Sequence, residues 1–402
     1  MTGDHGSGIA VGEKTETTDG YAARHAGSAA AGRHRRAARL RFGGVIGLVV
    51  ALAASGVLLL TSNTRHSRGA GGEQTLAEAW PRAKQGTLTG FVPDGPAYSP
   101  LYFFDVGTSV GTAPSQDGRY IRLLVRRGDG PPTELHRLPY PDSPQFGGFT
   151  FARDTLAWAE STIGPDGRDV TRMWALDRRS GGAPRALTSD TGDVAFFNSD
   201  YDSVIAGGRL HWVAVAASQE PVTELRSVAL TGGPVSRRDL PGAWAMTRWP
   251  WLVSAGAGQA GPTRLHNLES GKLVTVGGPA TELDTCSPSW CRALVLAGDG
   301  SPSRTDLMRP DGTDRRRIAG ATATAALIDV AVLDRFEVLT RAGQDGSPTS
   351  SQDLLLYDLK QRRTVLVATA VGMVLCRAGM LWWSTGDNEA LAWHVLDLRT
   401  LR

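Results

Sequence analysis

A four-strand pattern of about 40 residues, repeated along the chain, constrains the fold more than any other feature. Its clearest copy spans residues 149–188. A first strand, a turn at Arg153-Asp154 and a second strand at 156–159 are followed by a Gly/Pro/Asp loop. A third strand at 173–177, a Gly-rich turn and a fourth strand ending at Thr188 complete the copy. Four strands in about 40 residues are typical of one blade of a β-propeller.

Weaker copies continue to Arg402. The turns of their outer hairpins lie 39 to 51 residues apart, at Gly181, Gly232, Gly271, Gly312, Lys360 and Arg399. The second strands of the inner hairpins are expected at 156–160, 210–215, 251–255, 293–297, 336–340 and 380–384. An upstream copy comprises 101–106, 115–121, 123–126 and 134–138. We predict an all-β fold, a β-propeller of seven blades over residues 87–402, with six or eight blades also compatible with the spacing.

The last blade needs a strand from elsewhere in the chain. Residues 393–401 supply only a truncated outer hairpin. We expect segment 87–92 (TLTGFV) to add the missing strand and so to join the first and last blades. This closure would remove the free sheet edges that invite aggregation.

The N-terminal region predicts a membrane anchor. Residues 1–41 lack hydrophobic periodicity, end in the basic run RHRRAARLR (33–41), and are expected to form a disordered cytoplasmic tail. Residues 42–61 carry no charge and are long enough for one transmembrane helix. The preceding arginines place the N-terminus in the cytoplasm and the propeller outside, in an extracytoplasmic position. A cleaved signal peptide is the alternative. Residues 62–86 are expected to be a linker, with one helical turn within 76–84.

Several segments resemble the repeat of TolB-like propellers. Residues 115–118 (SQDG) are similar to the S-P-D-G element, with Gln in place of Pro. Residues 173–188 are similar to the L-W-x-x-D-L…L-T element, and 356–359 (LYDL) and 395–398 (VLDL) match its core. The resemblance is closest to membrane-anchored TolB-like proteins of actinomycetes. It implies a fold and no catalytic residue.

The three cysteines fall into a pair and a single residue. Cys286 and Cys291 flank a four-residue turn, and thiols outside the membrane tend to oxidise, so we predict a disulfide between them. Two buried free thiols are the alternative. Cys376 lies in an apolar strand and is expected to be a buried thiol.

No motif predicts catalysis, a metal or a cofactor. The G-x-S-x-G match at 107–111 is followed by no helix and is interpreted as a loop. The histidines show no zinc-binding spacing, and 164–169 and 299–300 lack the oxygen ligands of a calcium loop. A net charge of +3 gives no argument for nucleic acid as a partner.

Three short segments are weak candidates for a binding surface, because propeller ligands usually meet the loops between strands. Two are the polar loops 198–202 and 384–389, from which we select Asn198, Asp200, Tyr201, Asp387, Asn388 and Glu389. Ordinary Asx turns are the favoured explanation of both loops. The third is the Trp249-Pro250-Trp251 turn, which could expose an aromatic ring or fill a gap between blades.

These features together predict a non-catalytic binding or scaffold module, held at the outer face of the membrane by residues 42–61. Its partner would be an envelope protein or a wall component. The alternative is a propeller enzyme, a glycan hydrolase or lyase, with its site at the mouth of the central channel. That alternative requires convergent carboxylates with raised pKa values.

Overall fold

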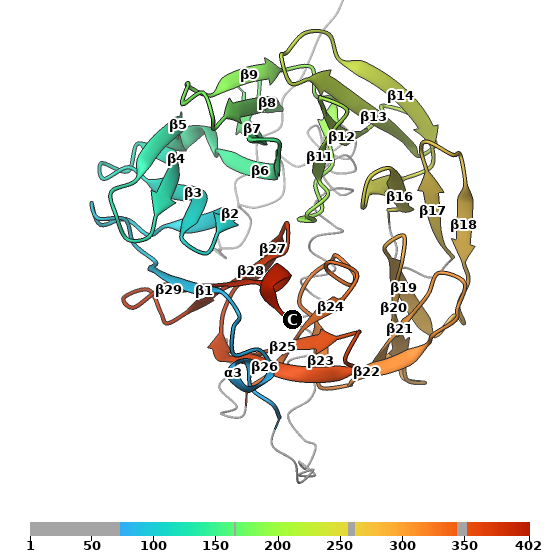
Figure 1. Ribbon diagram of the computed structural model, residues 1–402. Coiled ribbons are helices and arrows are strands. Elements are labelled where there is room, and N and C mark those ends of the chain that lie inside the picture. The colour runs from blue at the N-terminus through green and yellow to red at the C-terminus, as the bar shows by residue number, and fades with distance from the viewer. Residues whose placement is uncertain (1–72, 165, 256–261, 344–351) are drawn as a thin grey trace, which may run out of the picture. The chain divides into compact units, whose positions relative to one another are not determined.

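The described residues form seven antiparallel sheets. The computed structural model describes residues 73–164, 166–255, 262–343 and 352–402. In five of the seven sheets the strands follow one another in chain order from the innermost outwards, and the sheets of blades 3 and 7 depart from this order as described below. Figure 1 shows the sheets arranged in sequence around a central axis. The prediction of an all-β β-propeller with seven blades is therefore confirmed.

Blades 1 to 3 contain strands β2 to β14. Their bounds are β2 (Ser99–Asp105), β3 (Thr108–Pro114), β4 (Tyr120–Arg127) and β5 (Thr133–Pro139) in blade 1; β6 (Gln145–Ala152), β7 (Thr155–Ile163), β8 (Asp169–Asp177) and β9 (Arg185–Thr188) in blade 2; and β10 (Asp193–Val194), β11 (Ser203–Ala206), β12 (Arg209–Val215), β13 (Val222–Ala229) and β14 (Ser236–Pro241) in blade 3. A short 3-10 helix, η1 (Tyr140–Asp142), connects blades 1 and 2.

Blades 4 to 7 contain the remaining strands. Their bounds are β15 (Trp244–Met246), β16 (Trp251–Ser254), β17 (Thr263–Asn267) and β18 (Leu273–Val276) in blade 4; β19 (Glu282–Cys286), β20 (Cys291–Leu296), β21 (Pro302–Met308) and β22 (Arg316–Gly320) in blade 5; β23 (Ala323–Ala325), β24 (Phe336–Ala342), β25 (Gln352–Asp358) and β26 (Arg363–Val371) in blade 6; and β27 (Val374–Arg377), β28 (Met380–Thr385), β29 (Ala392–Asp397) and β1 in blade 7. The helix η2 (Leu398–Thr400) follows β29.

Blade 7 is completed by the N-terminal strand β1 (Gln85–Thr89). It pairs antiparallel with β29, with Gln85 opposite Leu396 and Thr89 opposite Ala392. The closing strand therefore comes from the predicted region, although it starts two residues before the expected segment 87–92. Hydrogen bonds between β1 and β29 thus make the N-terminal strand part of the last blade, and the chain then continues from β1 into blade 1, which closes the ring.

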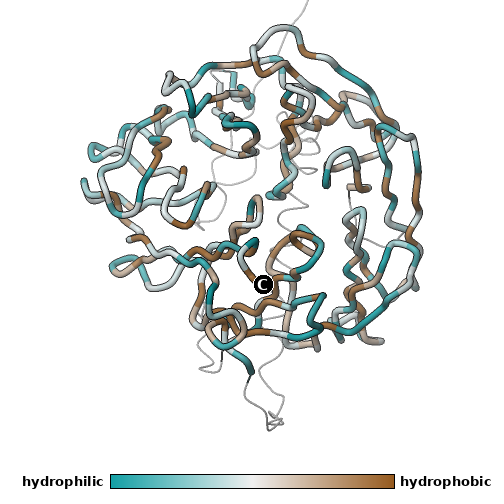
Figure 2. Tube along the Cα trace, in the orientation of Figure 1, coloured by the Kyte–Doolittle hydropathy of each residue, from teal (hydrophilic) through white to brown (hydrophobic). Residues whose placement is uncertain are grey.

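Apolar side chains between the blades form the core. Trp158, Trp212 and Trp382, each from the second strand of its blade, are fully buried. Figure 2 shows hydrophobic residues recurring along the strands, whereas the connections are mostly hydrophilic. Both faces of these strands are covered by neighbouring blades, which explains their nearly continuous apolar sequence.

Part of the segment expected as a linker packs onto the propeller. Helix α3 (Leu76–Ala79) begins with a capping box, in which Thr75 and Glu78 bond each other's backbone amides. Trp80 is buried with its ring edge-on to Phe336 of blade 6. Within the described ranges, no helix is both long and apolar enough to cross a membrane. The expected tail (1–41) and membrane helix (42–61) lie outside the described residues.

The predicted disulfide between Cys286 and Cys291 is present. It joins β19 to β20 across their turn, where the two residues are directly opposite in the pairing. Cys376 is free and buried, and burial raises the pKa of its thiol well above the ordinary value. It therefore has the character of a core residue and not of a nucleophile.

Candidate functional site at the propeller axis

In two blades the chain forms an irregular segment next to the innermost strand, outside the regular pairing of the sheet. In blade 3, β10 and β11 both pair with β12, and residues 195–202 between them make an excursion from the sheet. In blade 6, the innermost strand β23 is short, and residues 327–335 form a long connection to β24. Both excursions include residues with positive φ, namely Asn198 in the first and Ala331, Leu333 and Asp334 in the second. Such backbone is held only where the surroundings fix it.

The two excursions meet each other. Ser199 Oγ donates a hydrogen bond to Asp329 Oδ1 at 2.6 Å, and the amide of Asp200 donates to Asp329 Oδ2 at 2.8 Å. Blades 3 and 6 are not neighbours in the ring, so a contact between them has to cross its centre. We call residues 195–202 and 327–335 together the axial plug.

Blade 7 bonds the plug from a third direction. The amide of Ala378 donates to Asp200 Oδ2 at 2.9 Å. Arg377 is 7% exposed and donates to the carbonyl of Ser199 and, at 3.1 Å, to Asn198 Oδ1. Three blades are thus tied together at the axis by polar contacts.

The blade 6 excursion has its own buried support. Arg292 of β20 bonds the carboxylate of Glu337 and donates to the carbonyl of Ile328 at 3.1 Å. The other oxygen of Glu337 accepts from the amide of Ala331 at 2.8 Å. This ion pair positions the backbone on both sides of Asp329.

Three plug carboxyl groups have raised pKa values. Burial raises the pKa of Asp202 to about 7. Burial, with the nearby charge of Asp329, raises the pKa of Asp200 to about 6. Burial also raises the pKa of Asp329. Desolvation disfavours the charged form of each group, although backbone donors and the charge of Arg377 oppose the shift.

A cavity of about 260 Å³ lies beside the plug. Its walls come from the inner strands of blades 1, 2 and 7 and from the blade 3 excursion. The lining is mostly apolar, with Leu101, Phe146, Phe149, Phe196 and Leu375. Asn198, Asp202 and Arg377 contribute the polar lining, together with the backbone of Gly147 and Gly148.

The two glycines make room for one cavity wall. Gly148 has φ +56°, and a Cβ added there would lie 2.7 Å from the ring of Phe196. Strand β6 shifts register between Gly147 and Thr150, as at a β-bulge. The Gly-Gly pair therefore lets Phe196 approach the backbone of blade 2 closely.

The structure separates the residues that the sequence suggested for binding. Asn198, Asp200 and Tyr201 belong to the axial plug. Asp387, Asn388 and Glu389 lie instead in the exposed turn between β28 and β29, where Asp387 accepts from the amides of Glu389 and Ala390 at 2.9 and 3.0 Å. These bonds lower the pKa of Asp387, as expected of an Asx turn.

The Trp249-Pro250-Trp251 turn is a packing element. Trp249 is half-buried, with its ring centroid 4.2 Å from that of His211 in blade 3. Trp251 is half-buried and packs against the core between blades 4 and 5.

Sequence reasoning missed Asp329, Arg377 and the cavity walls. Asp329 sits in an apolar run (326–333) in which one carboxylate could have drawn attention, because such a residue must find partners when buried. No comparable signal marks Arg377, which ends an ordinary short strand.

The remaining motifs have structural roles. The G-x-S-x-G match at 107–111 is not the expected loop: all but its first residue lie in strand β3, and Ser109 is buried with its hydroxyl 3.0 Å from that of Tyr98. In the part of the chain that the structure describes, no group of three or more His, Cys, Asp or Glu side chains could hold a metal ion.

No protein-family model matches the sequence, and no curated protein matches it significantly. Solved structures similar to the chain include the β-propeller domain of the Trilobed protease from Pyrococcus furiosus, with 9% identity, TM-score 0.41, and coverage of 63% of this chain and 80% of that one. A puromycin-hydrolysing peptidase of Mycobacterium tuberculosis has 15% identity and TM-score 0.45, with 84% and 56% covered. A prolyl endopeptidase has 12% identity and TM-score 0.46, with 75% and 46% covered. The chain spans about half the length of these two peptidases. Such similarities concern the β-propeller architecture alone.

Proposed function

We propose that this protein is a non-catalytic binding module of the TolB-like, membrane-anchored type, with residues 42–61 as its single membrane span. In this proposal the propeller is extracytoplasmic and docks an envelope protein. A wall component is the other partner that the sequence suggested. The observation that supports this proposal is the composition of one face of the propeller.

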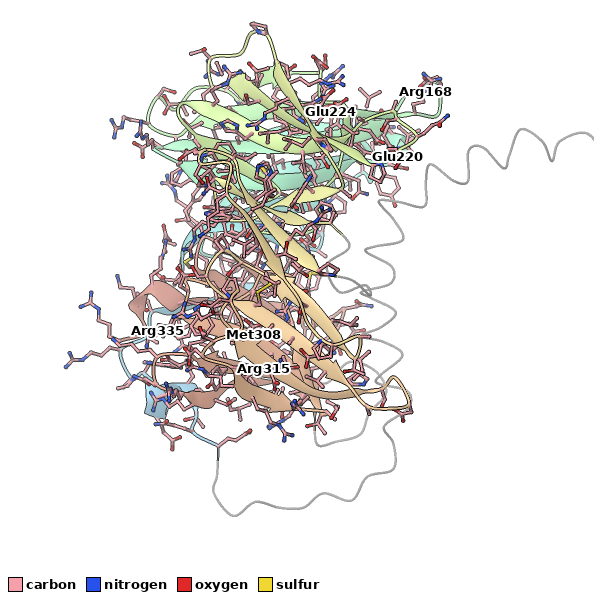
Figure 3. All side chains as sticks on the ribbon, turned by 90° about the vertical axis from the view of Figure 1, so that its right-hand side faces the viewer. Arg168, Glu220, Glu224, Met308, Arg315 and Arg335 are labelled. Carbon is pink, nitrogen blue, oxygen red and sulfur yellow. A yellow bond between two sulfur atoms is a disulfide. The ribbon has the colours of Figure 1, made fainter. Side chains whose placement is uncertain are left out.

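That face is formed by the connections between second and third strands and by those between successive blades. Figure 3 shows Arg168 and Glu220, from two such connections, on the side opposite Arg335 of the plug. The four most exposed large apolar side chains on this face are Tyr140 (59%), Ile163 (47%), Val215 (46%) and Met373 (57%). Tyr140 and Met373 lie in connections between blades, whereas Ile163 and Val215 end strands β7 and β12. Exposed apolar side chains on one face supply the apolar contacts that a protein-binding surface needs.

The connections of the same face are acidic, although Asp94 and Asp190 form ion pairs with Arg122 of β4 and Arg226 of β13. Its described connections contain two basic residues, Arg119 and Arg168, against nine acidic ones: Asp94, Asp117, Asp142, Asp166, Asp190, Glu220, Asp299, Asp387 and Glu389. We call this face, with its four apolar side chains, the docking face. Its charge favours a partner with a basic surface, because complementary charge accelerates and orients association.

The plug supports a binding role over catalysis. Asp202 accepts from the amides of Phe197 and Ser199 at 2.7 and 3.1 Å. Both oxygens of Asp329 are bonded to the other excursion. Carboxylates engaged in this way cross-link loops and leave few lone pairs for a substrate.

Site-specific photo-crosslinking in intact cells tests the proposal. A photoreactive residue at Val215 of the full-length protein should give a discrete protein adduct. The same residue at Leu273, which is 63% exposed on the outer strand β18, serves as the matched control. Equal adducts from both positions, or no protein adduct from Val215, would refute docking through this face.

The raised pKa values favour one second candidate, a propeller enzyme such as a glycan hydrolase or lyase. Carboxyl groups with pKa values of about 6 and 7 can act as acids near neutral pH. If this candidate is correct, full-length protein will release soluble fragments from isolated wall material, and Asp202→Asn will abolish the release. Intact wall material after prolonged incubation with wild-type protein would eliminate it.

A further inference from the structure

Arg377 is a buried cation with an incomplete set of partners. It is 7% exposed, and its two bonds go to neutral acceptors, the carbonyl of Ser199 and the side-chain oxygen of Asn198. Among the described residues, no carboxylate forms an ion pair with its guanidinium within 4.0 Å, although its charge acts on Asp200, Asp202 and Asp329 from a greater distance. A guanidinium has five N–H donors, so donors remain for a further acceptor.

Arg377 lines the cavity beside the plug, where donors would otherwise face apolar walls. Asp202 also lines the cavity, but its two oxygens already accept backbone amides. Asn198 contributes the oxygen that Arg377 already uses. At the polar end of the cavity, the guanidinium of Arg377 is therefore the group that remains able to donate a hydrogen bond to a ligand.

The rest of the cavity suits an apolar body. Three phenylalanines and two leucines form its walls. Its 260 Å³ exceeds the ~150 Å³ apolar cavity that holds benzene, and is near the lower limit for pockets that bind small ligands. Because Asn198 is exposed and Phe146, Phe196 and Leu375 are only half-buried, the cavity is in contact with solvent.

We propose that this cavity binds a small, mainly apolar molecule that carries one oxygen acceptor, with the apolar body between the phenylalanines and the oxygen bonded to Arg377. The acceptor belongs to a carboxylate or to a neutral carbonyl. This proposal does not depend on the identity of the docking partner proposed above.

Three fluorinated probes test the inference by ligand-observed fluorine NMR. They are 4-fluorophenylacetate, 4-fluorophenylacetamide and 4-fluorotoluene, which share an apolar ring and differ in the oxygen acceptor. The full-length protein is held in lipid nanodiscs, and empty nanodiscs correct for partitioning into lipid. We expect at least one oxygenated probe to bind about tenfold more tightly than 4-fluorotoluene, the effect of one hydrogen bond. Tighter binding of the acetate identifies a carboxylic acid, and equal binding of the two identifies a neutral carbonyl.

Two kinds of variant locate the probe. Leu375→Trp fills the cavity and should weaken binding at least about tenfold, with Leu101→Trp as a second filling variant from the neighbouring blade 1. Leu273→Trp makes the same change on the exposed outer strand β18 and should leave binding unchanged. Arg377→Met should retain 4-fluorotoluene while losing the preference for the oxygenated probes.

Binding of 4-fluorotoluene as tight as that of both oxygenated probes would overturn the role of Arg377. Undiminished binding in both filling variants, each shown to be folded by its thermal transition, would overturn the location. Absence of binding by all three probes up to about 10 mM would overturn the proposal as a whole.

Discussion

Replacing Asp329 with alanine removes both hydrogen bonds between the two excursions of the axial plug. The hydroxyl of Ser199, which is 6% exposed, and the amide of Asp200 then lose their acceptor. Each unsatisfied buried donor costs about 1 to 3 kcal/mol, so the two together cost about 2 to 6 kcal/mol. Burial raises the pKa of Asp329, which shows that its charge is itself unfavourable there, and its removal offsets part of the loss. We expect a net destabilisation of about 2 to 4 kcal/mol.

Thermal unfolding of the full-length protein, followed by tryptophan fluorescence, measures this loss. For a domain of several hundred residues, 1 kcal/mol corresponds to roughly 1 to 2 °C in Tm, so the expected decrease is about 2 to 8 °C. A double-mutant cycle with Ser199→Ala should give a coupling of about 1 to 2 kcal/mol, because the two side chains bond each other directly.

Asp311→Ala is the matched control. Asp311 also accepts two hydrogen bonds, from the amide and the hydroxyl of Thr313 at 2.9 and 2.6 Å, but in an exposed turn where water can replace the carboxylate. Its Tm should decrease far less. A decrease for Asp329→Ala no larger than that for Asp311→Ala would refute the conclusion that the plug ties the blades together.

Two further predictions concern buried polar groups. The folded-state pKa of Asp202 is about 7 against an ordinary 3.8, so between these values the folded protein holds a proton that the unfolded chain releases. Lowering the pH from 8 to 5 should therefore stabilise the protein through this group, by on the order of 3 kcal/mol at most, and Tm measured against pH should have a flatter slope for Asp202→Asn. Trp212→Phe should cost about 1 to 3 kcal/mol more than Trp382→Phe in thermal unfolding. Both indoles are fully buried, but that of Trp212 donates to the carbonyl of Thr191 at 2.8 Å, whereas that of Trp382 has no partner among the described residues. Equal costs would contradict this prediction.

The blades were predictable because each is a local unit. The turns expected at Gly181, Gly232, Gly271 and Gly312 all lie between the third and fourth strands of their blades, and each of these glycines has positive φ. Glycine adopts positive φ without steric cost, so a Gly between two apolar runs predicts a turn at that position. The closing strand was harder to place, because its register is set by β29, which lies about 300 residues away.

The axial plug could not be predicted, because no local rule brings its parts together. Ser199 and Asp329 are 130 residues apart, and Arg377 comes from a third blade. The loop 198–202 has the Asn, Asp and Ser composition of an ordinary turn, and Asp202 does accept from Ser199 as an Asx turn would. Its carboxylates acquire raised pKa values only from burial at the ring's centre, a property of the closed propeller and not of the loop.

The plug and the cavity have one physical cause. Seven sheets leave an axial space that main-chain atoms of the regular inner strands do not fill, and loops drawn into it must satisfy their polar groups away from water. On one side of the blade 3 excursion, Ser199 and Asp200 satisfy their polar groups by hydrogen bonds to Asp329. On its other side, the ring of Phe196 lines the cavity. The same loop thus closes the axis with polar contacts and forms an apolar wall beside it. Arg377 is shared by both sides, because it bonds the plug and lines the cavity. A ligand that bonds Arg377 would therefore add a contact to the group that ties blade 7 to blade 3, and it should raise the Tm of wild-type protein but not that of Leu375→Trp.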